Sequence, residues 1–299
     1  NENMEDTSMK QIELKSLAKI NLGLDVLGRR ENGYHDVRMI MQSIYLYDEV
    51  KIKRTKNPGI EIKTNLYFLP TGKENIAYKA AEMLIEEFHI EEGVHITLNK
   101  HIPVAAGMAG GSSNAAAVLY GMNKMFDLKL TQTELMERGV KLGADVPYCI
   151  MRGTVLAEGI GEELTTLTPM PKCFVLIAKP PISVSTKVVY EALDSKELVE
   201  HPDIDGLIEG LEKRDLKTIA SCMGNVLEDV TIPMHPVIEE IKQEMKNAGA
   251  LNAMMSGSGP TVFGLFETKA AARKAQDRIR RRALAKQVYV TNVHGAGRN

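Results

Sequence analysis

The stretch Pro103-Val104-Ala105-Ala106-Gly107-Met108-Ala109-Gly110-Gly111-Ser112-Ser113-Asn114-Ala115-Ala116-Ala117 decides how this chain is interpreted. Glycine permits positive φ and close backbone approach to a ligand, so successive amide N–H groups can line a concave anion site. Residues 115–126 have the composition and apolar spacing of a helix, with Ser112 or Ser113 as its expected N-cap. A glycine-rich turn at a helix N-terminus binds anions, because free N–H groups and the helix dipole act together. The stretch therefore predicts a nucleotide polyphosphate site.

A less specific interpretation is a tight turn into a buried helix, with small residues that serve packing alone. The loop is not a Walker A loop, because no Gly-Lys-Ser/Thr follows, and it contains no G-x-G-x-x-G fingerprint. The unbroken Gly110-Gly111-Ser112-Ser113 ahead of three alanines favours the anion site. We expect Gly110 and Gly111 to need close backbone approach and positive φ there.

Composition indicates a globular protein with one large domain or two ordinary ones. The chain has 299 residues, of which 44% are hydrophobic and 25% charged. A net charge of −2 provides no bulk attraction to nucleic acid or to a membrane surface. The basic run at residues 278–282 is interpreted as a solvated helix face. No apolar run approaches the roughly 18 residues of a transmembrane helix.

The cysteines and the first residues bear on location. Cys149, Cys173 and Cys222 are far apart and form no C-x-x-C pair, which predicts reduced, buried thiols in a cytoplasmic protein. Residues 1–8 are polar and show no signal-peptide pattern, so we expect a disordered leader.

Periodicity predicts the elements of the first half of the chain. Alternating apolar and polar residues indicate two long strands, over 12–28 and 37–54, joined by a turn over 29–33. Residues 131–134 form a capping box that opens a helix to about Leu142, with Gly143 as its stop. The remaining predicted elements are a helix over 75–88 and strands over 94–99, 148–151 and 154–157.

A domain boundary is predicted at 165/166, where prolines at 169 and 171 interrupt the pattern. The domains would be residues 9–165 and 166–299. The second half is expected to contain helices over 185–193, 205–213, 215–228, 236–247 and 269–283, and strands over 174–178, 251–255, 261–266 and 287–293. Helices and strands clustered in this way favour two α+β sandwiches.

Four short segments carry polar residues whose placement needs an explanation. Lys19 lies in an otherwise apolar strand and is either functional or an edge lysine that snorkels. Residues 28–35, with Asn-Gly ahead of Tyr-His, form either a site or a plain hairpin. Asp145 follows a helix stop and precedes a proline, which is also an ordinary turn position. Residues 256–261 are either a second backbone surface near phosphate or a hairpin loop.

Taken together, a lysine, an aspartate and a polyphosphate site are the minimum set for phosphoryl transfer to a hydroxyl, in which positioning and charge stabilisation dominate. The aspartate can accept the hydroxyl proton. A nearby lysine keeps the aspartate ionised and stabilises the developing alkoxide.

These segments resemble the GHMP kinase superfamily, which includes galactokinase, homoserine kinase and mevalonate kinase. Residues 103–117 are similar to the superfamily's ATP-binding motif, and residues 256–261 fit its third motif. Residues 18–24, Gly28-Arg29-Arg30 with Asn32-Gly33-Tyr34-His35, and residues 143–147 resemble the branch that acts on 4-CDP-2-C-methyl-D-erythritol. Mevalonate and homoserine kinases lack the Arg-Arg and Gly-Tyr-His segment. One departure is Ala109, where the family loop usually has glycine; alanine is tolerable only if residue 109 does not need positive φ.

The resemblance implies an α+β, two-domain GHMP kinase fold, with an N-terminal domain like ribosomal protein S5 domain 2 and a ferredoxin-like C-terminal domain. It implies ATP-dependent phosphorylation of the 2-hydroxyl of 4-CDP-2-C-methyl-D-erythritol, in the non-mevalonate route to isoprenoid precursors. Magnesium would arrive with ATP, without a dedicated protein cage. No nucleic acid or membrane partner is expected.

The resemblance also assigns roles to residues. Asp145 would be the base and Lys19 its electrostatic partner, while the triphosphate would bind residues 103–113. Other positions carried over are Asn75 for the nucleotide, His35 for the cytosine edge, Tyr34 and Tyr190 for stacking on the base, and Asn21 and Thr186 for polar contacts with the substrate.

Other functions are compatible with parts of the pattern. The first is another small-molecule GHMP kinase, acting on mevalonate or homoserine. The second is a nucleotide-binding regulator on a kinase scaffold, a class that tends to lose the lysine or the aspartate. An RNA-binding role is suggested only by analogy with the fold, and no basic patch in the sequence supports it.

Overall fold

The computed structural model describes residues 9–197 and 200–296, and the predicted leader lies outside them. The described residues form two compact units. Unit 1 comprises residues up to Leu17 together with Tyr47–Ile102 and Gly110–Met151, and unit 2 comprises Ala18–Leu46, Pro103–Ala109 and the residues from Arg152 onward. The units interleave along the chain, and the division at 165/166 stays a prediction. None of the described helices is long and apolar enough to cross a membrane.

Two long strands, β1 (Gln11–Arg29) and β2 (His35–Thr55), contribute residues to both units, and the sequence predicted both. In unit 1, β2 pairs antiparallel with β4 (Gly93–Asn99), which pairs parallel with β3 (Ile60–Thr64). Period-2 alternation buries Val50 and Ile52 of β2, while the alternate positions Lys51 and Lys53 stay more exposed. One face of this sheet therefore forms a core and the other is polar.

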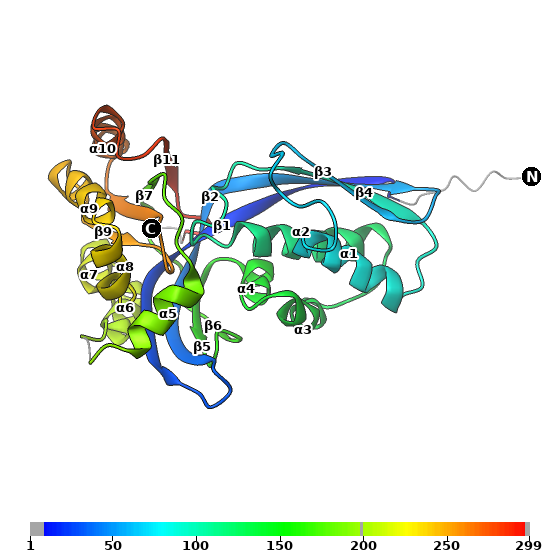
Figure 1. Cartoon of the computed structure of the whole chain (residues 1–299), viewed down its shortest axis with the longest axis horizontal. Helices are drawn as coiled ribbons and strands as arrows, with labels where there is room; N and C mark the ends of the chain where they lie inside the picture. The colour runs from blue at the N-terminus through cyan, green and yellow to red at the C-terminus, as the bar shows by residue number, and fades with distance from the viewer. Residues whose placement is uncertain (1–8, 198–199, 297–299) are drawn as a thin grey trace, which may run out of the picture. The chain divides into compact units, whose positions relative to one another are not determined.

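Helices cover the apolar face of the sheet in unit 1 (Figure 1). They are α1 (Ile76–Glu87), α2 (Gly110–Met125), α3 (Gln132–Leu142) and α4 (Val146–Met151). Helix α2 packs against the other three, and residues 115–119 along it are all buried. The first turn of α2 is thereby fixed by its neighbours, which matters for the glycine-rich stretch that it continues.

Unit 2 contains a four-stranded antiparallel sheet in the order β11-β7-β10-β9. Its strands are β7 (Phe174–Lys179), β9 (Asn252–Met255), β10 (Val262–Phe266) and β11 (Gln287–Asn292). Helices α9 (Val237–Asn247) and α10 (Lys269–Arg281) pack against it. Apart from the elements inserted between β7 and α9, the order β7-α9-β9-β10-α10-β11 is the predicted ferredoxin-like arrangement.

The remaining elements of unit 2 are short. Strands β5 (Thr154–Glu158) and β6 (Glu163–Thr166) extend the first sheet beside β2, and β8 (Gly224–Asn225) pairs with β1. The helices are α5 (Thr186–Asp194), α6 (Ile204–Glu212), α7 (Leu216–Cys222) and α8 (Glu228–Met234).

Three sequence predictions about elements were wrong. Residues 148–151 belong to helix α4 rather than to a strand; a short apolar run is ambiguous, and Pro147 fits the first helical turn, where no N–H is needed. The helix predicted over 215–228 ends at Cys222, and β8 follows. Helix α2 begins at Gly110, so Ser112 and Ser113 lie in its first turn and are not N-caps.

Candidate functional site

The glycine-rich loop, defined as residues 103–113, has three left-handed residues in its first half. They are Ala105 (φ 51°), Gly107 (φ 83°) and Ala109 (φ 55°). Left-handed residues at alternate positions bring successive N–H groups to one side of the chain, the geometry of an anion nest. Ala109 thus does need positive φ, and the alanine is held in a conformation that glycine adopts more easily.

The carbonyl groups of this half of the loop are bound within unit 2. Thr261 N–H donates to the Ala106 carbonyl at 3.3 Å, and Lys19 N–H donates to the Met108 carbonyl at 3.2 Å. The Ser256 hydroxyl donates to the Gly107 carbonyl at 3.0 Å. No amide N–H from Met108 to Ser113 donates a hydrogen bond within the described part of the chain. With carbonyls bound and amides available, the loop presents donors to an anion.

The second half of the loop is the first turn of α2, Gly110–Ser113. The first four N–H groups of a helix have no partner within it, so the helix start at Gly110 adds these amides to the donor set. Neither Gly110 nor Gly111 has positive φ, which corrects the expectation for both. A Cβ on Gly110 would meet Ile102 Cγ2 at 3.2 Å, whereas one on Gly111 would meet nothing within 4 Å.

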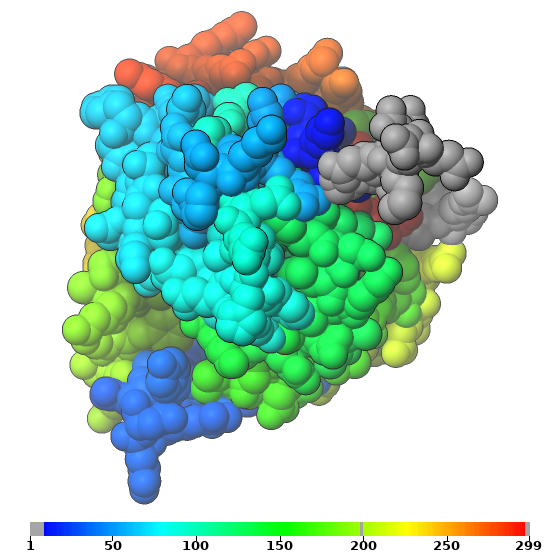
Figure 2. All heavy atoms as spheres, turned by 90° about the vertical axis from the view of Figure 1, so that its right-hand side faces the viewer, coloured from blue at the N-terminus to red at the C-terminus, as the bar shows by residue number. Residues whose placement is uncertain are grey.

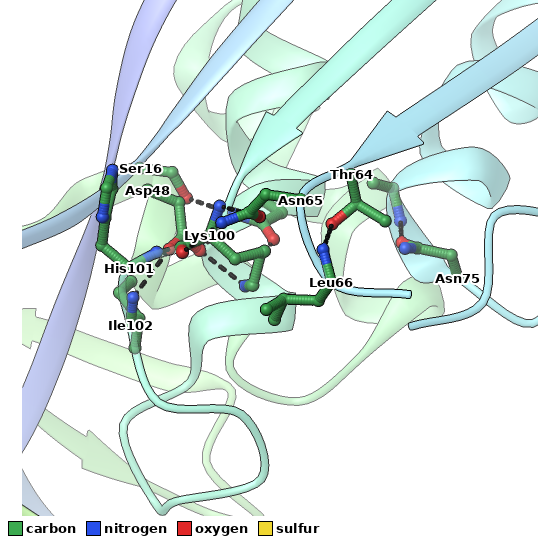
Figure 3. A network of polar contacts seen from close by, with 11 residues as sticks. Ser16, Asp48, Thr64, Asn65, Leu66, Asn75, Lys100, His101 and Ile102 are labelled. Carbon is green, nitrogen blue, oxygen red and sulfur yellow. Dashed lines mark hydrogen bonds and ion pairs between the residues drawn. The ribbon is translucent and has the colours of Figure 1, made fainter. Parts of the chain in front are cut away.

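A buried carboxylate in unit 1 holds the segment before the loop and the helix after it (Figure 3). Asp48 is fully buried. Its Oδ1 accepts from the N–H groups of His101 (2.7 Å) and Ile102 (2.8 Å). Its Oδ2 accepts from Lys100 Nζ at 2.5 Å and from Asn114 Nδ2 at 2.9 Å. One side chain therefore fixes both the approach to the loop and the first turn of α2.

Asp48 is not among the site residues predicted from the sequence, although the sequence carries a signal for it. In β2 the buried positions alternate as Leu46, Asp48, Val50 and Ile52, so an acidic residue stands where the period calls for an apolar one. Asn65 adds support, because its carboxamide accepts from Lys100 N–H at 2.8 Å and donates to the Lys100 carbonyl at 3.0 Å.

Asp145 lies in unit 1, in the turn between α3 and α4. A Cβ on Gly143 would lie 3.8 Å from Ser112 Oγ, so this turn packs beside the first turn of α2. Its backbone carbonyl accepts from Cys149 N–H at 3.0 Å. The carboxylate is half-buried and accepts no hydrogen bond from the residues that the structure describes.

Asn75, the other candidate in unit 1, has a structural task. It is the N-cap of α1: its Oδ1 accepts from Ala77 N–H at 2.9 Å, and its Nδ2 donates to the Pro70 carbonyl at 3.0 Å. A contact with nucleotide stays a prediction for this residue.

Lys19 lies in unit 2 and is not a snorkelling edge lysine, since it is only 6% exposed. Its Nζ donates to Asn21 Oδ1 at 2.7 Å and to the Gly107 carbonyl at 3.2 Å. Asn21, fully buried, also accepts from Gly257 N–H at 3.1 Å. Lys19 is thereby fixed on the glycine-rich loop, and Asn21 ties it to residues 256–261. These contacts support a positioning role for Asn21.

The residues predicted to bind the base divide into a cluster and an exposed turn. The rings of His35 and Tyr190 pack at 4.9 Å between centroids, tilted by 50°, and His35 Nε2 lies 2.7 Å from Asp194 Oδ1. Tyr34 is 60% exposed and lies in the turn that follows β1. The atoms of this turn are the blue spheres at the lower left of Figure 2. Thr186 Oγ1 lies 2.8 Å from Ser258 Oγ, which joins α5 to the loop 256–261.

Within the described residues, no group of three or more His, Cys, Asp or Glu side chains could hold a metal ion. How magnesium binds together with ATP stays a prediction.

Two family models match the chain. The model for the GHMP kinases N terminal domain matches residues 75–153, and the model for GHMP kinases C terminal matches residues 207–286. The first match contains the glycine-rich loop and Asp145, and the second contains residues 256–261.

Curated relatives match over nearly the whole chain. The 4-diphosphocytidyl-2-C-methyl-D-erythritol kinase of Lachnospira eligens is 57% identical over 285 residues, which cover 95% of this chain and 99% of the relative. The protein of the same name from Lachnoclostridium phytofermentans is 57% identical over 283 residues, covering 95% of this chain and 97% of the relative.

Solved structures give the same fold. A crystal structure of 4-(cytidine 5'-diphospho)-2C-methyl-D-erythritol kinase matches with a TM-score of 0.82 and 30% identity, covering 95% of this chain and 100% of that chain. Homoserine kinase from Cytophaga hutchinsonii matches with a TM-score of 0.78 and 22% identity, covering 99% of each chain, a likeness that concerns the fold alone. The predicted α+β fold with N- and C-terminal kinase domains is confirmed.

Proposed function

Since this chain belongs to the 4-diphosphocytidyl-2-C-methyl-D-erythritol kinases of the GHMP superfamily, we propose that it transfers the γ-phosphoryl group of ATP to the 2-hydroxyl of that substrate. The observation that carries the proposal is 57% identity over nearly the full length of relatives with this name. The likeness to homoserine kinase, at 22% identity, does not extend beyond the fold. Location in the cytoplasm stays a prediction.

The triphosphate of ATP binds the glycine-rich loop, residues 103–113. Amide groups from Met108 to Ser113 have no acceptor within the described residues, and those of Gly110–Ser113 add the positive end of the α2 dipole. Because the carbonyls of Ala106, Gly107 and Met108 are bound elsewhere, the loop need not reorganise to present its donors. Such preorganisation is the main source of catalysis in phosphoryl transfer.

Asp145 is the general base. Its carboxylate takes the proton of the 2-hydroxyl, the hydroxyl oxygen forms a bond to the γ-phosphorus, and the bond from that phosphorus to the β,γ-bridging oxygen breaks. The absence of a hydrogen-bond donor to this carboxylate within the described residues supports the role, because an already bound carboxylate is a poorer base. Lys19, held by Asn21 and the Gly107 carbonyl, supplies positive charge toward the developing alkoxide.

The cytidine end of the substrate binds at His35, Tyr34 and Tyr190, with Thr186 as a polar contact. The packing of His35 against Tyr190 supports a base subsite, and Tyr34, being exposed, is free to cover a bound base. A magnesium ion carried on the ATP phosphates would neutralise part of their charge. The hydroxyl groups of Ser112 and Ser113 in the first turn of α2 are the chain's candidate contacts to that phosphate-bound ion.

Asp145→Asn is the variant that tests this proposal. A lost general base lowers kcat by roughly 10²–10⁴-fold, whereas the KM for ATP should change little. Asp127→Asn is the matched control, because Asp127 is 74% exposed and pairs with the exposed Lys129. Single-turnover transfer from γ-labelled ATP measures the chemical step, and 31P NMR identifies the phosphorylated hydroxyl. Near-normal transfer by Asp145→Asn would refute the assignment of the base, and a product phosphorylated elsewhere would refute the assignment of the acceptor.

A further inference from the structure

His35, the histidine proposed to bind the cytosine edge, contacts the carboxylate of Asp194. Asp194 lies outside the family motifs found in the sequence. Asp194 Oδ1 lies 2.7 Å from His35 Nε2, and the two side chains are 24% and 12% exposed. Asp194 follows Tyr190 by four residues on α5, so both side chains project from one face of that helix. Tyr190 packs on the His35 ring. Helix α5 thus supplies both the packing partner and the hydrogen-bond partner of His35.

The second oxygen of Asp194 also faces a cation. Arg29 Nη1 lies 3.7 Å from Asp194 Oδ2. The carboxylate is therefore held from two sides, with one oxygen toward His35 and the other toward Arg29. Its orientation toward the imidazole does not depend on the histidine alone.

This contact determines which ring nitrogen of a neutral His35 carries the proton. An ionised carboxylate only accepts hydrogen bonds, so Nε2 must be the N–H nitrogen and Nδ1 must carry the lone pair. His35 Nδ1 has no hydrogen-bond partner among the described residues. The side-chain atoms that are both buried and unpaired among those residues are Thr261 Oγ1 and His294 Nδ1, so the unpaired His35 Nδ1 is not buried. His35 Nδ1 is therefore a solvent-accessible acceptor.

We propose that Asp194 is a specificity-determining residue, which fixes His35 in the tautomer whose Nδ1 accepts a hydrogen bond from the 4-amino group of cytosine. This inference rests on the proposed function and extends it to a residue that does not itself touch the base. Cytosine presents an N4 amino donor, whereas a uracil ring presents an O4 acceptor at the same place. An acceptor facing an acceptor leaves both groups unpaired in a desolvated contact. The fixed tautomer therefore selects cytosine, which stacking on tyrosine cannot do, because every base has a π-face.

The test is Asp194→Asn. A carboxamide can accept from Nε2–H or donate to an unprotonated Nε2, so it no longer imposes one tautomer. Replacing the aspartate that orients a histidine by asparagine is known to admit the wrong tautomer in serine proteases. The matched control is Asp205→Asn, because Asp205 in the same unit pairs with Arg38 and is 83% exposed.

The first readout is the ratio of kcat/KM for the cytidine substrate to that for its uridine analogue. We expect a ratio of at least roughly tenfold in the unchanged protein and in Asp205→Asn. In Asp194→Asn it should fall to within about threefold, chiefly through better use of the uridine analogue. A structural defect alone would lower both values and preserve the ratio. A preserved ratio in Asp194→Asn would overturn the proposal.

The second readout is independent of the substrate. Nitrogen-15 NMR of His35 in the ligand-free protein should show a neutral ring protonated at Nε2, and a tautomer mixture in Asp194→Asn. A doubly protonated ring, or one protonated at Nδ1, would overturn the inference whatever the enzyme phosphorylates. If the expected tautomer is found but 4-CDP-2-C-methyl-D-erythritol is not phosphorylated, the proposed function fails and the specificity claim fails with it.

Discussion

Replacing Gly107 by alanine should damage the glycine-rich loop more than any other glycine substitution in it. Gly107 has φ 83°, and a Cβ there would lie 2.3 Å from the Ser256 carbonyl oxygen and 3.4 Å from that of Gly259. These are backbone atoms, so no side-chain rotation can relieve the overlap. Residues 103–109 and 256–261 would have to separate.

The expected loss of stability follows from the interactions that break when residues 103–109 and 256–261 separate. A left-handed alanine costs about 1–2 kcal/mol. The Gly107 carbonyl would lose its bonds from Ser256 Oγ and Lys19 Nζ, each worth about 0.5–1.5 kcal/mol. We therefore expect a loss of about 2–5 kcal/mol in the free energy of unfolding. If the protein stays folded with the loop displaced, the free energy needed to restore the loop is taken from ATP binding. A restoring free energy of about 2 kcal/mol would raise the Kd for ATP roughly 30-fold.

Urea unfolding and calorimetric titration with an ATP analogue measure the two effects. Gly111→Ala is the matched control for stability, because a Cβ at Gly111 meets nothing within 4 Å and the residue is helical. It should keep or slightly raise the unfolding midpoint, since alanine is the better helix former. A Gly107→Ala protein with an unchanged midpoint and unchanged ATP affinity would refute the argument that this close approach shapes the phosphate site.

Three further predictions concern stability and reactivity. Asp48→Asn removes the charge that faces buried Lys100 and should cost about 3–5 kcal/mol in urea unfolding; a shift no larger than that of Asp127→Asn would contradict the role of the network. Ala109→Gly relieves a positive φ of 55° and should stabilise the protein by about 0.5–1 kcal/mol; a lower unfolding midpoint would count against the strain. Burial raises the pKa of Cys173 to about 12, so native protein at pH 8 should be alkylated at the half-exposed Cys222 and not at Cys173. Mass spectrometry measures the labelling, and the protection of Cys173 should be lost as pH rises toward that pKa. Equal labelling of both cysteines at pH 8 would contradict this prediction.

The sequence predicted best where a local period decides the structure. Period-2 alternation located β1 and β2 to within two residues at each end, and the capping box at Thr131 and Glu134 is present with both hydrogen bonds. Such patterns depend only on which face is buried or which amide is capped. The two-residue strand β8 has no such pattern, because only its pairing with β1 defines it.

The candidate site was predicted as a set of residues but not as a set of contacts. Which glycine needs positive φ depends on Ser256, which lies 149 residues from Gly107 in the chain. Asp194 lies 159 residues from His35, and its spacing carries no local signal. Asp48 could have been found, because a charge in the buried register of a strand requires a partner. Tertiary partners of this kind decide roles that residue type and spacing leave open.

The proposed activity is tested by phosphoryl transfer from γ-labelled ATP to three acceptors offered separately: 4-CDP-2-C-methyl-D-erythritol, mevalonate and homoserine. We predict label in the cytidine compound alone, on its 2-hydroxyl, and a rate of labelling roughly 10²–10⁴-fold lower in Asp145→Asn. Robust labelling of mevalonate or homoserine, or no transfer to the cytidine compound by folded protein that binds ATP, would contradict the proposed activity.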